Sequence, residues 1–327
     1  MTIYIQSAAS IWPGSLPASQ TVWQNALHCA DPDLTGTVDP KQSRRMSHVI
    51  KMGIAAAMQT LQQAGVDEPD ALVIGTAYGC LEDTGIFLKK QVLQKETMLT
   101  PTAFIQSTHN TVGGQIGLLL HCHGYNNTIV HRGFSFDHAM LDATMLLQNG
   151  DAQKVLAGGL DEMTNFSHAI LSRFGLYKSS PTSAHGTIAG EGAAFFLLSA
   201  EAKASHWAKI IATSTLFKPQ NHSLVVAHLL AFLANNNLTP LDIAVVFSGS
   251  NGHPADDEVY CEVKKAIFPM VPFIAFKQDL GEYPTATAHG LYCAATYAKS
   301  NKGKSNTYLL FNHYQNIYHS FMLLATV

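Results

Sequence analysis

Short runs of β-branched and other apolar residues alternate along this chain with longer segments in which apolar residues recur at helical spacing. The segments 43–64, 133–149 and 284–298 predict helices, and Gly65 is a suitable C-cap for the first of them. Strands alternating with helices favour an α/β protein around a mostly buried sheet. The runs that predict its strands are 71–77, 154–160, 193–200, 243–250, 273–276, 306–312 and 319–326.

The composition excludes several classes of protein. Hydrophobic residues make up 47% of the 327 residues and charged residues 13%, about half the usual ~25%. Such a chain is not disordered, and its net charge of -3 provides no basic surface for nucleic acid. No apolar run reaches the ~18 residues of a membrane span, and the N-terminus lacks a signal-peptide pattern, so we expect a cytoplasmic protein. A surface this poor in charge also leads us to expect that a partner covers part of it.

The cysteines and histidines give no pattern typical of a metal site. The five cysteines are widely spaced, odd in number and contain no C-x-x-C pair. His121, Cys122 and His123 form the densest group, but adjacent side chains on a strand or helix point in different directions. We therefore expect neither a metal ion nor a cofactor.

The most informative segment is 124–162, which predicts a strand, a sharp turn, a long helix, a short turn and a second strand. The sharp turn falls at His131–Arg132–Gly133, and Asn149–Gly150 ends the helix. A turn that leads into a helix is where an enzyme places a nucleophile, because the helix dipole and free amides stabilise a thiolate or oxyanion there.

This segment resembles the nucleophile region of β-ketoacyl synthases, the condensing enzymes of the thiolase fold. The match has no gaps and includes His138, the turn Gly150–Asp151–Ala152, the run Ala157–Gly158–Gly159 and the acidic residue Glu162. Two further segments carry the resemblance. Residues 186–201 (GTIAGEGAAFFLLSAE) are similar to a family hairpin, and residues 101–124 resemble the strand and helix that precede the nucleophile.

The resemblance implies a thiolase-like α/β fold in which two related βαβ halves form a five-layered αβαβα arrangement. The halves are residues 1–203 and 204–327, joined into one compact unit, and the region near 201–208 is the boundary between them.

A condensing synthase uses a cysteine thiolate and two histidines. The resemblance places Gly133 at the nucleophile position, Gly249 at the first histidine and Glu282 at the second. The glycine-rich gate of the family is also replaced, by FNHYQNIYHSF at 311–321. We therefore predict that these three positions are degenerate and that the chain alone does not catalyse condensation.

Three nearby side chains do not restore the motif. Ser135 lies two residues beyond Gly133, so its side chain points elsewhere on the helix. His253 stands four residues beyond Gly249 and is expected to be a turn histidine, and His289 reaches the second histidine position only after a shift of seven residues.

Proteins of this family that lack the nucleophile and pair with an active synthase are chain-length factors. The resemblance implies a heterodimer in which this chain shapes the acyl tunnel of an active β-ketoacyl-acyl carrier protein synthase, in polyene, polyketide or fatty-acid-like biosynthesis. The subfamily that it resembles is the aryl polyene type. The carrier protein would then bind through the complex, because basic residues on this chain are scattered.

The resemblance also gives candidate residues for this role. Arg132 and Glu282 are a candidate pair that fills the empty thiol pocket, and we expect the apolar excess to gather on one face near residues 101–136. The candidates for the tunnel and the subunit interface are Phe104, Thr108, His109, Val112, Phe134 and Phe136.

Two other functions stay open at this point. The first is a divergent malonyl-carrier decarboxylase or acyltransferase that uses Glu282 or His289 in place of the missing residues. The second is a scaffold that binds an acyl chain or an acyl carrier protein without catalysis.

Overall fold

The computed structural model describes residues 2–14, 25–97 and 101–327. In these residues, ten strands form one hydrogen-bonded sheet in the order β3-β2-β4-β5-β1-β6-β10-β9-β7-β8. The strands are β1 (Ile3–Ile11), β2 (Ala71–Gly75), β3 (Tyr125–Ile129), β4 (Lys154–Asp161), β5 (Gly192–Ser199), β6 (Ala208–Phe217), β7 (Ile243–Ser248), β8 (Phe273–Ala275), β9 (Thr307–Tyr314) and β10 (Tyr318–Ala325).

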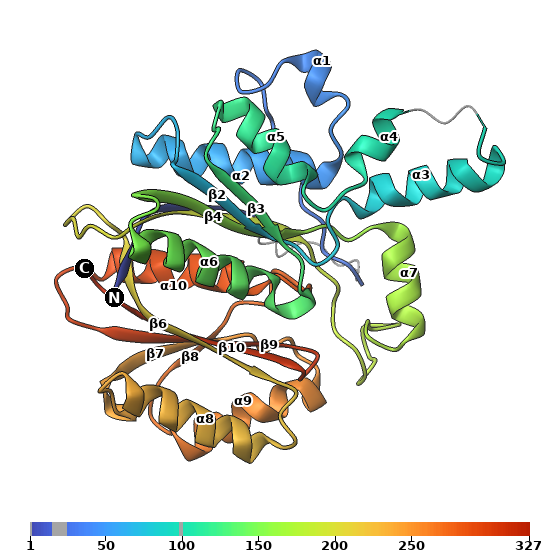
Figure 1. Ribbon diagram of the computed structural model, residues 1–327. Helices are drawn as coiled ribbons and strands as arrows, with labels where there is room; N and C mark the ends of the chain where they lie inside the picture. Colours follow the sequence, from blue (N-terminus) through green and yellow to red (C-terminus); the bar gives the residue numbers. More distant parts are fainter. Residues whose placement is uncertain (1, 15–24, 98–100) are drawn as a thin grey trace.

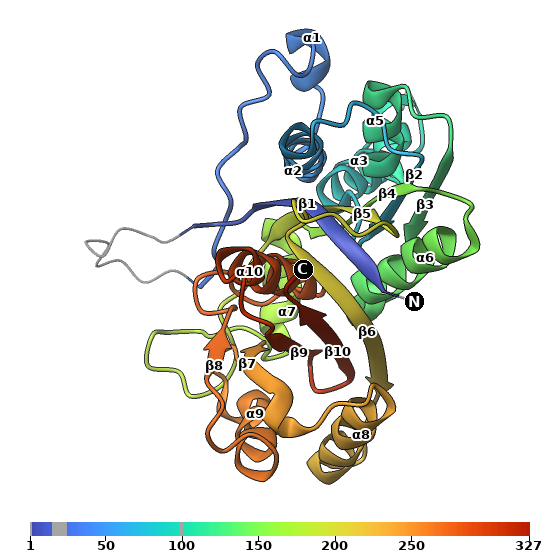
Figure 2. The ribbon, with the colours of Figure 1, turned by 90° about the vertical axis from the view of Figure 1, so that its left-hand side faces the viewer.

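The helices form three layers on and between the two parts of this sheet (Figure 1). One outer layer contains α2 and α5, the middle layer α6 and α10, and the other outer layer α8 and α9 (Figures 1 and 2). The helices are α1 (Pro40–Ser43), α2 (His48–Ala64), α3 (Leu81–Leu93), α4 (Pro101–Gln106), α5 (Thr111–Leu120), α6 (Ser135–Asn149), α7 (Asn165–Arg173), α8 (His222–Asn235), α9 (Pro254–Ala266) and α10 (Thr287–Ser300). Two short 3-10 turns are η1 (Arg132–Phe134) and η2 (Pro240–Asp242).

The sheet consists of two parts that meet at β1 and β6. Only the pairs from Ile3↔Ile210 to Ile5↔Ala208 join these strands, whereas β1 and β5 pair along almost their whole length. Strands β1–β5 come from residues 3–199 and strands β6–β10 from residues 208–325. The result is the α/β, five-layered αβαβα arrangement of a thiolase-like fold, as predicted.

Three apolar cores hold the layers together. One lies between α2 and the first part of the sheet, one surrounds α6 and α10, and one lies beneath α8 and α9. Strands β2, β4 and β5 have helices on both faces, so nearly all of their residues are buried. This double burial explains why they appear in the sequence as continuous apolar runs.

The predicted strands and helices are present, with some changes of boundary. The first helix starts at His48, after Ser47, and is preceded by the separate short helix α1. Gly65 ends it in the left-handed conformation, with φ 63°, as a C-cap requires. The helix predicted over 133–149 begins with the turn η1, and the regular helix α6 follows.

The prediction of a strand and a helix in residues 101–124 was wrong, because this segment forms the two helices α4 and α5. Helix α5 contains glycines that let β3 approach closely. A Cβ atom on Gly113 or Gly117 would lie about 3.0 or 2.9 Å from the side-chain amide of Asn126. Strands β1 and β6 were not predicted, because small and polar residues interrupt their apolar pattern.

Residues 186–201 do not form a hairpin. Their second half is β5, which pairs with β4 and β1. Their first half makes isolated bridges instead, in which Ala189 pairs with Ala26 and with Glu282. In the described residues, no helix combines the length and the apolar character needed to cross a membrane.

Candidate functional site at the end of β9

The three positions that the sequence predicts to be degenerate catalytic positions, Gly133, Gly249 and Glu282, lie around the last residues of β9. Gly133 lies against Tyr314, Gly249 lies against Asn312, and Glu282 shares a small pocket with Tyr314. Residues more than 100 positions apart in the sequence are therefore brought together at one strand end, as in an enzyme active site.

At the nucleophile position, the space for a side chain is already filled. A Cβ atom on Gly133 would lie 2.7 Å from the Cβ atom of Tyr318 and 2.8 Å from that of Tyr314. Real Cβ atoms essentially never approach other atoms so closely, so position 133 accepts only glycine without movement of the backbone. Phe134 packs edge-on against Tyr318, with ring centroids 5.1 Å apart, and closes this cluster.

The turn itself is held by local hydrogen bonds. The hydroxyl of Ser135 donates to the carbonyl oxygen of Arg132 (2.8 Å) and accepts from the backbone N–H of His131 (2.8 Å). Arg132 has a φ of 48°, in the left-handed region, which is uncommon for a residue with a side chain. Ser135 is thus fully engaged with the backbone of the turn and does not replace the missing thiol.

At the first histidine position, Gly249 faces two polar side chains. A Cβ atom there would overlap Oδ1 of Asn312 and would lie 2.8 Å from the hydroxyl of Tyr260. Asn312 is buried and donates from Nδ2 to Oγ1 of Thr287 (2.7 Å). Because Asn312 and Tyr260 occupy this space, an imidazole at position 249 has no room.

At the second histidine position, Glu282 forms a buried ion pair. Nζ of Lys277, which is 2% exposed, lies 2.9 Å from both carboxylate oxygens of Glu282 and donates to the carbonyl oxygen of His313 (2.9 Å). Asn251 donates from Nδ2 to Oε2 of Glu282 (2.7 Å). Burial raises the pKa of Glu282, and the charge of Lys277 and the hydrogen bonds oppose that rise. Two donor groups, Nζ of Lys277 and Nδ2 of Asn251, point at the carboxylate and favour its ionised form.

The proposed pairing of Arg132 with Glu282 is not found. The side chain of Arg132 is exposed, and Lys277 is the cation that pairs with Glu282. Arg132 instead lines an open cleft of about 510 Å³, together with Tyr78, Phe174 and Tyr314. The hydroxyls of Tyr78 and Tyr314, which both line this cleft, lie 3.1 Å apart.

The other histidines near the motif have structural partners. Nδ1 of His289 lies 2.9 Å from the hydroxyl of Ser10, and burial lowers the pKa of this imidazole to about 4. His253 is the N-cap residue of α9, and its Nδ1 lies 3.3 Å from Oδ2 of Asp256. Neither imidazole is paired with Glu282 in the described residues.

The candidates for the tunnel and interface separate into exposed and buried residues. Phe104 is 58% exposed, and Thr108 and His109 are also exposed. Val112 is only 2% exposed and packs in the core beneath α2, so the surface does not present it. Phe134 and Phe136 are buried, and Phe136 packs against Phe196 in the middle layer.

A buried carboxylate that the sequence reasoning missed organises the loop after β2. Oδ1 of Asp161, the last residue of β4, accepts hydrogen bonds from Oγ1 of Thr76 (2.9 Å) and from the backbone N–H groups of Ala77 and Tyr78 (2.8 and 2.9 Å). Its Oδ2 accepts from Oγ1 of Thr285 (2.8 Å). Burial raises the pKa of Asp161 to about 6, although these hydrogen bonds favour the ionised form. The nearest signal in the sequence was the acidic pair at 161–162.

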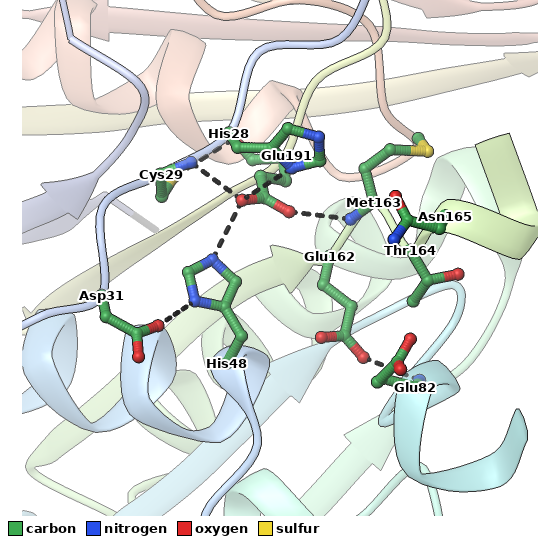
Figure 3. A pocket seen from close by; sticks show the side chains of 10 residues that line it. All are labelled: His28, Cys29, Asp31, His48, Glu82, Glu162, Met163, Thr164, Asn165 and Glu191. Atoms are coloured by element: carbon green, nitrogen blue, oxygen red, sulfur yellow. Dashed lines mark hydrogen bonds and ion pairs between the residues drawn. The ribbon is translucent and has the colours of Figure 1, made fainter. Parts of the chain in front are cut away.

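A second pocket, of about 340 Å³, lies where the loop after β1 meets the N-terminal ends of α2, α3 and α7 (Figure 3). Its centre is the buried Glu191. Oε1 of Glu191 accepts from the backbone N–H of Cys29 (2.8 Å) and lies 2.9 Å from Nε2 of His48, and Oε2 accepts from the N–H of Met163 (2.9 Å). Burial opposes ionisation of Glu191, but these partners and His28 lower its pKa to about 2.

The imidazole of His48 completes this network. Burial alone would lower the pKa of His48, but its hydrogen bonds to Glu191 and Asp31 raise it to about 9. On the opposite wall, Oε1 of Glu162 accepts from the N–H of Glu82 (3.0 Å) at the start of α3 (Figure 3). Burial raises the pKa of Glu162 to about 7. The network ties the loop after β1 to β4 and β5.

The comparison with protein families decides which family this fold and these motifs represent. The model of the β-ketoacyl synthase N-terminal domain matches residues 5–204. The chain belongs to the β-ketoacyl synthase family. Gly133, Glu162 and Glu191 all lie inside the matched part of this synthase-family chain. No curated protein sequence matches it.

Solved structures share the synthase fold over the whole chain. The ishigamide ketosynthase/chain length factor matches with a TM-score of 0.81 and 13% identity, over 100% of this chain and 99% of that chain. A β-ketoacyl synthase from Burkholderia phymatum STM815 matches with a TM-score of 0.77 and 16% identity, over 99% of both chains. A ketosynthase in complex with a type II polyketide synthase acyl-carrier protein matches with a TM-score of 0.78 and 14% identity, over 100% and 99%. At these identities the matches establish the fold.

Proposed function

We propose that this chain is a non-catalytic chain-length factor that pairs with an active β-ketoacyl-acyl carrier protein synthase and shapes its acyl tunnel. The observation that carries the proposal is the filled nucleophile position, where Tyr314 and Tyr318 leave no space for a side chain on Gly133. A covalent acyl-enzyme needs a nucleophile at that place. Asn312 beside Gly249 and the ion pair at Glu282 support the same conclusion.

The surface supports a role as a subunit. Helices α3, α4 and α7 lie at one end of the molecule (Figure 1), and no residue of α3 is buried. Phe87 of α3 packs against Phe104 of α4, with ring centroids 5.5 Å apart. A Cβ atom on Gly85 would lie 2.6 Å from the ring of Phe166, so α3 also contacts α7. Apolar side chains exposed on these helices are Ile86, Leu88, Val92, Leu93, Phe104, Ile105, Phe166 and Ile170.

We call this set of exposed side chains on α3, α4 and α7 the apolar end. It extends beyond the expected region of 101–136, since it includes α3 and α7. An exposed patch of this kind rimmed by polar residues is typical of a protein–protein interface. In the part of the chain that the structure describes, β3 is an edge strand of the sheet, and exposed strand edges are also sites of association. We assign the apolar end and Phe104 to the contact with the synthase partner.

The product class is part of the proposal. The compact chain and the segment 281–286 favour the aryl polyene subfamily, and the structural neighbours named as a ketosynthase/chain length factor and as a type II polyketide synthase ketosynthase support a product of the polyketide class. The carrier protein would bind to the complex, as it does to the ketosynthase in a second neighbour.

The proposal is tested by co-expression with the β-ketoacyl synthase encoded in the same gene neighbourhood. We expect a mixed complex in native mass spectrometry and a change in product length when Phe104 is replaced by Trp. Leu93→Asp should weaken the complex, whereas Met270→Asp, which changes another strongly exposed apolar residue on a different part of the surface, should not.

Other outcomes overturn the proposal. Isolation of the chain as a soluble monomer, with unchanged synthase products in its absence, removes the chain-length role. Release of carbon dioxide from malonyl-acyl carrier protein by the chain alone, abolished by Glu282→Gln or His289→Gln, establishes the decarboxylase alternative. Capture of an acyl carrier protein without any synthase establishes the scaffold.

A further inference from the structure

A group of three metal-ligating side chains lies on the second outer layer, apart from the site at β9. Helices α8 and α9 lie side by side there (Figures 1 and 2). His222, the first residue of α8, faces Glu258 and Glu262 of α9, and one ligand atom from each lies within 4.8 Å of the other two. Among the described residues, this is the one group of His, Cys, Asp and Glu with that geometry.

The carboxylates of Glu258 and Glu262 carry like charges, and no lysine or arginine of the described residues is paired with them. Glu258 and Glu262 are four residues apart on one helix, so they occupy the same face and repel each other. In the described part of the chain, neither forms an ion pair with a lysine or arginine. The ion-pair partner of Glu262 is His222, with Nδ1 at 3.7 Å from Oε1. A cation between the carboxylates would relieve this repulsion.

A second observation concerns a buried imidazole in the same half of the chain. His319 of β10 is 1% exposed, and neither of its ring nitrogens has a hydrogen-bond partner within 3.5 Å. Burial lowers the pKa of His319 to about 4; the charge of His222 acts in the same direction, and the backbone of Asn316 opposes it. A buried imidazole without such a partner is uncommon unless water or a ligand satisfies it.

We propose that His222, Glu258 and Glu262 bind a divalent transition-metal ion, with zinc as the best fit, that ties α8 to α9. One imidazole nitrogen and two carboxylate oxygens are ligands that zinc accepts, with the remaining positions open to water. Zinc ligands at about 2.0–2.2 Å from the ion lie roughly 3–3.5 Å apart, so rotation of the glutamate side chains is enough to close the site. Magnesium prefers oxygen ligands and fits less well. The site departs from the expectation that the chain binds no metal.

The test uses the full chain after removal of metals with EDTA. Zinc chloride is titrated by isothermal calorimetry, and thermal unfolding is followed with and without zinc. We expect one tight site in the parent chain and a higher unfolding temperature with zinc, because a ligand of the folded state stabilises it. Glu258→Gln and Glu262→Gln should each weaken this site about tenfold or more, and magnesium chloride should give no shift.

Two controls separate this site from the other histidines. Glu201→Gln changes an exposed glutamate elsewhere, and His123→Ala removes a histidine outside the group; both should leave the tight site intact. The glutamine variants keep the shape of the side chain, so their unfolding in EDTA should match that of the parent. The proposal is overturned if the parent binds no zinc, or if Glu258→Gln and Glu262→Gln bind it as tightly as the parent does.

Discussion

The Cβ atom of Tyr318 lies only 2.7 Å from the position that a Cβ atom on residue 133 would occupy, so Tyr318 leaves no space for a side chain on Gly133. The two residues come from segments almost 200 residues apart in the sequence: Gly133 from the turn before α6, and Tyr318 from the start of β10. The hairpin of β9 and β10 thus fills the space beside Gly133, the position that the sequence predicts for the nucleophile of a synthase.

Replacement of Gly133 is therefore expected to destabilise the chain without creating activity. Gly133→Cys and Gly133→Ala should each lower the free energy of unfolding by about 1–3 kcal/mol, since the added atom overpacks the core. The added Tyr318→Ala change should not restore stability, because the nearest atom is the Cβ of residue 318, which alanine retains. Denaturation in urea measures these effects.

The matched control for this prediction is Gly114→Ala. Gly114 lies inside α5 with nothing within 4 Å of an added Cβ atom, so alanine there should be neutral or stabilising by about 0.5–1 kcal/mol. A Gly133→Cys chain that is as stable as the parent and that accepts an acyl group would contradict the structural account.

The buried pair of Lys277 and Glu282 should respond strongly to removal of one partner. Lys277→Met leaves the carboxylate of Glu282 buried without its cation and should cost about 3–5 kcal/mol of stability. The double variant Lys277→Met/Glu282→Leu should recover much of that loss, because both charges are then gone. In contrast, Arg132→Ala and Glu282→Gln should be additive within about 0.5 kcal/mol. A double-mutant cycle in urea measures both couplings.

The burial of His289 predicts a dependence of stability on pH. Its pKa is lowered by burial to about 4, below the ordinary 6.5, so between these values the unfolded chain binds a proton that the folded chain does not. This contribution is complete above pH 6.5 and is lost as the pH falls toward 4. His289→Gln should reduce the loss of stability between pH 7 and pH 5 by about 2 kcal/mol. An equal loss in parent and variant would contradict this.

Glu191 should control the charge of His48. The pKa of His48 reaches about 9 because its hydrogen bonds to Glu191 and Asp31 outweigh burial, so this stabilisation is complete below pH 6.5 and is lost as the pH rises through 9. Glu191→Gln should lower the pKa of His48 and destabilise the chain, because two backbone N–H groups lose a carboxylate acceptor. Histidine NMR titration measures the pKa, and Glu201→Gln is the control. An unchanged pKa of His48 would refute the coupling.

The sequence predicted the strands that are buried on both faces, because double burial produces continuous apolar runs such as those of β2 and β4. It did not predict β1, because small and polar residues interrupt the apolar pattern of this strand. Hydroxyl and backbone contacts explain such residues only once the fold is known: Oγ of Ser7, for example, donates to the carbonyl oxygen of Thr60 (2.7 Å).

Motif spacing predicted Gly133, Gly249 and Glu282 as one group of positions, and the structure places all three beside the last residues of β9. Their assignment to the catalytic positions of a synthase stays a prediction. The motif spacing did not identify Tyr314 and Tyr318. A motif matches residue types position by position along the sequence, and it does not indicate which distant side chain lies beside a given position in the fold. The partner of Glu282 was likewise misjudged, because Lys277 reaches it from five residues away and Arg132 does not.

The place of β1 between β5 and β6 has a consequence for how the chain folds. Among the described strands β1 precedes the others in the sequence, yet the ladder partners of Ile5 stand about 200 residues later, at Leu198 and Ala208. This strand therefore stays without these partners until they have also left the ribosome. Pairing over such sequence distances is slow, because the entropy cost of closing a long loop comes before any stabilising contact forms. The segment Ile3–Ile11 is thus the point at which a nascent chain depends most on protection from aggregation.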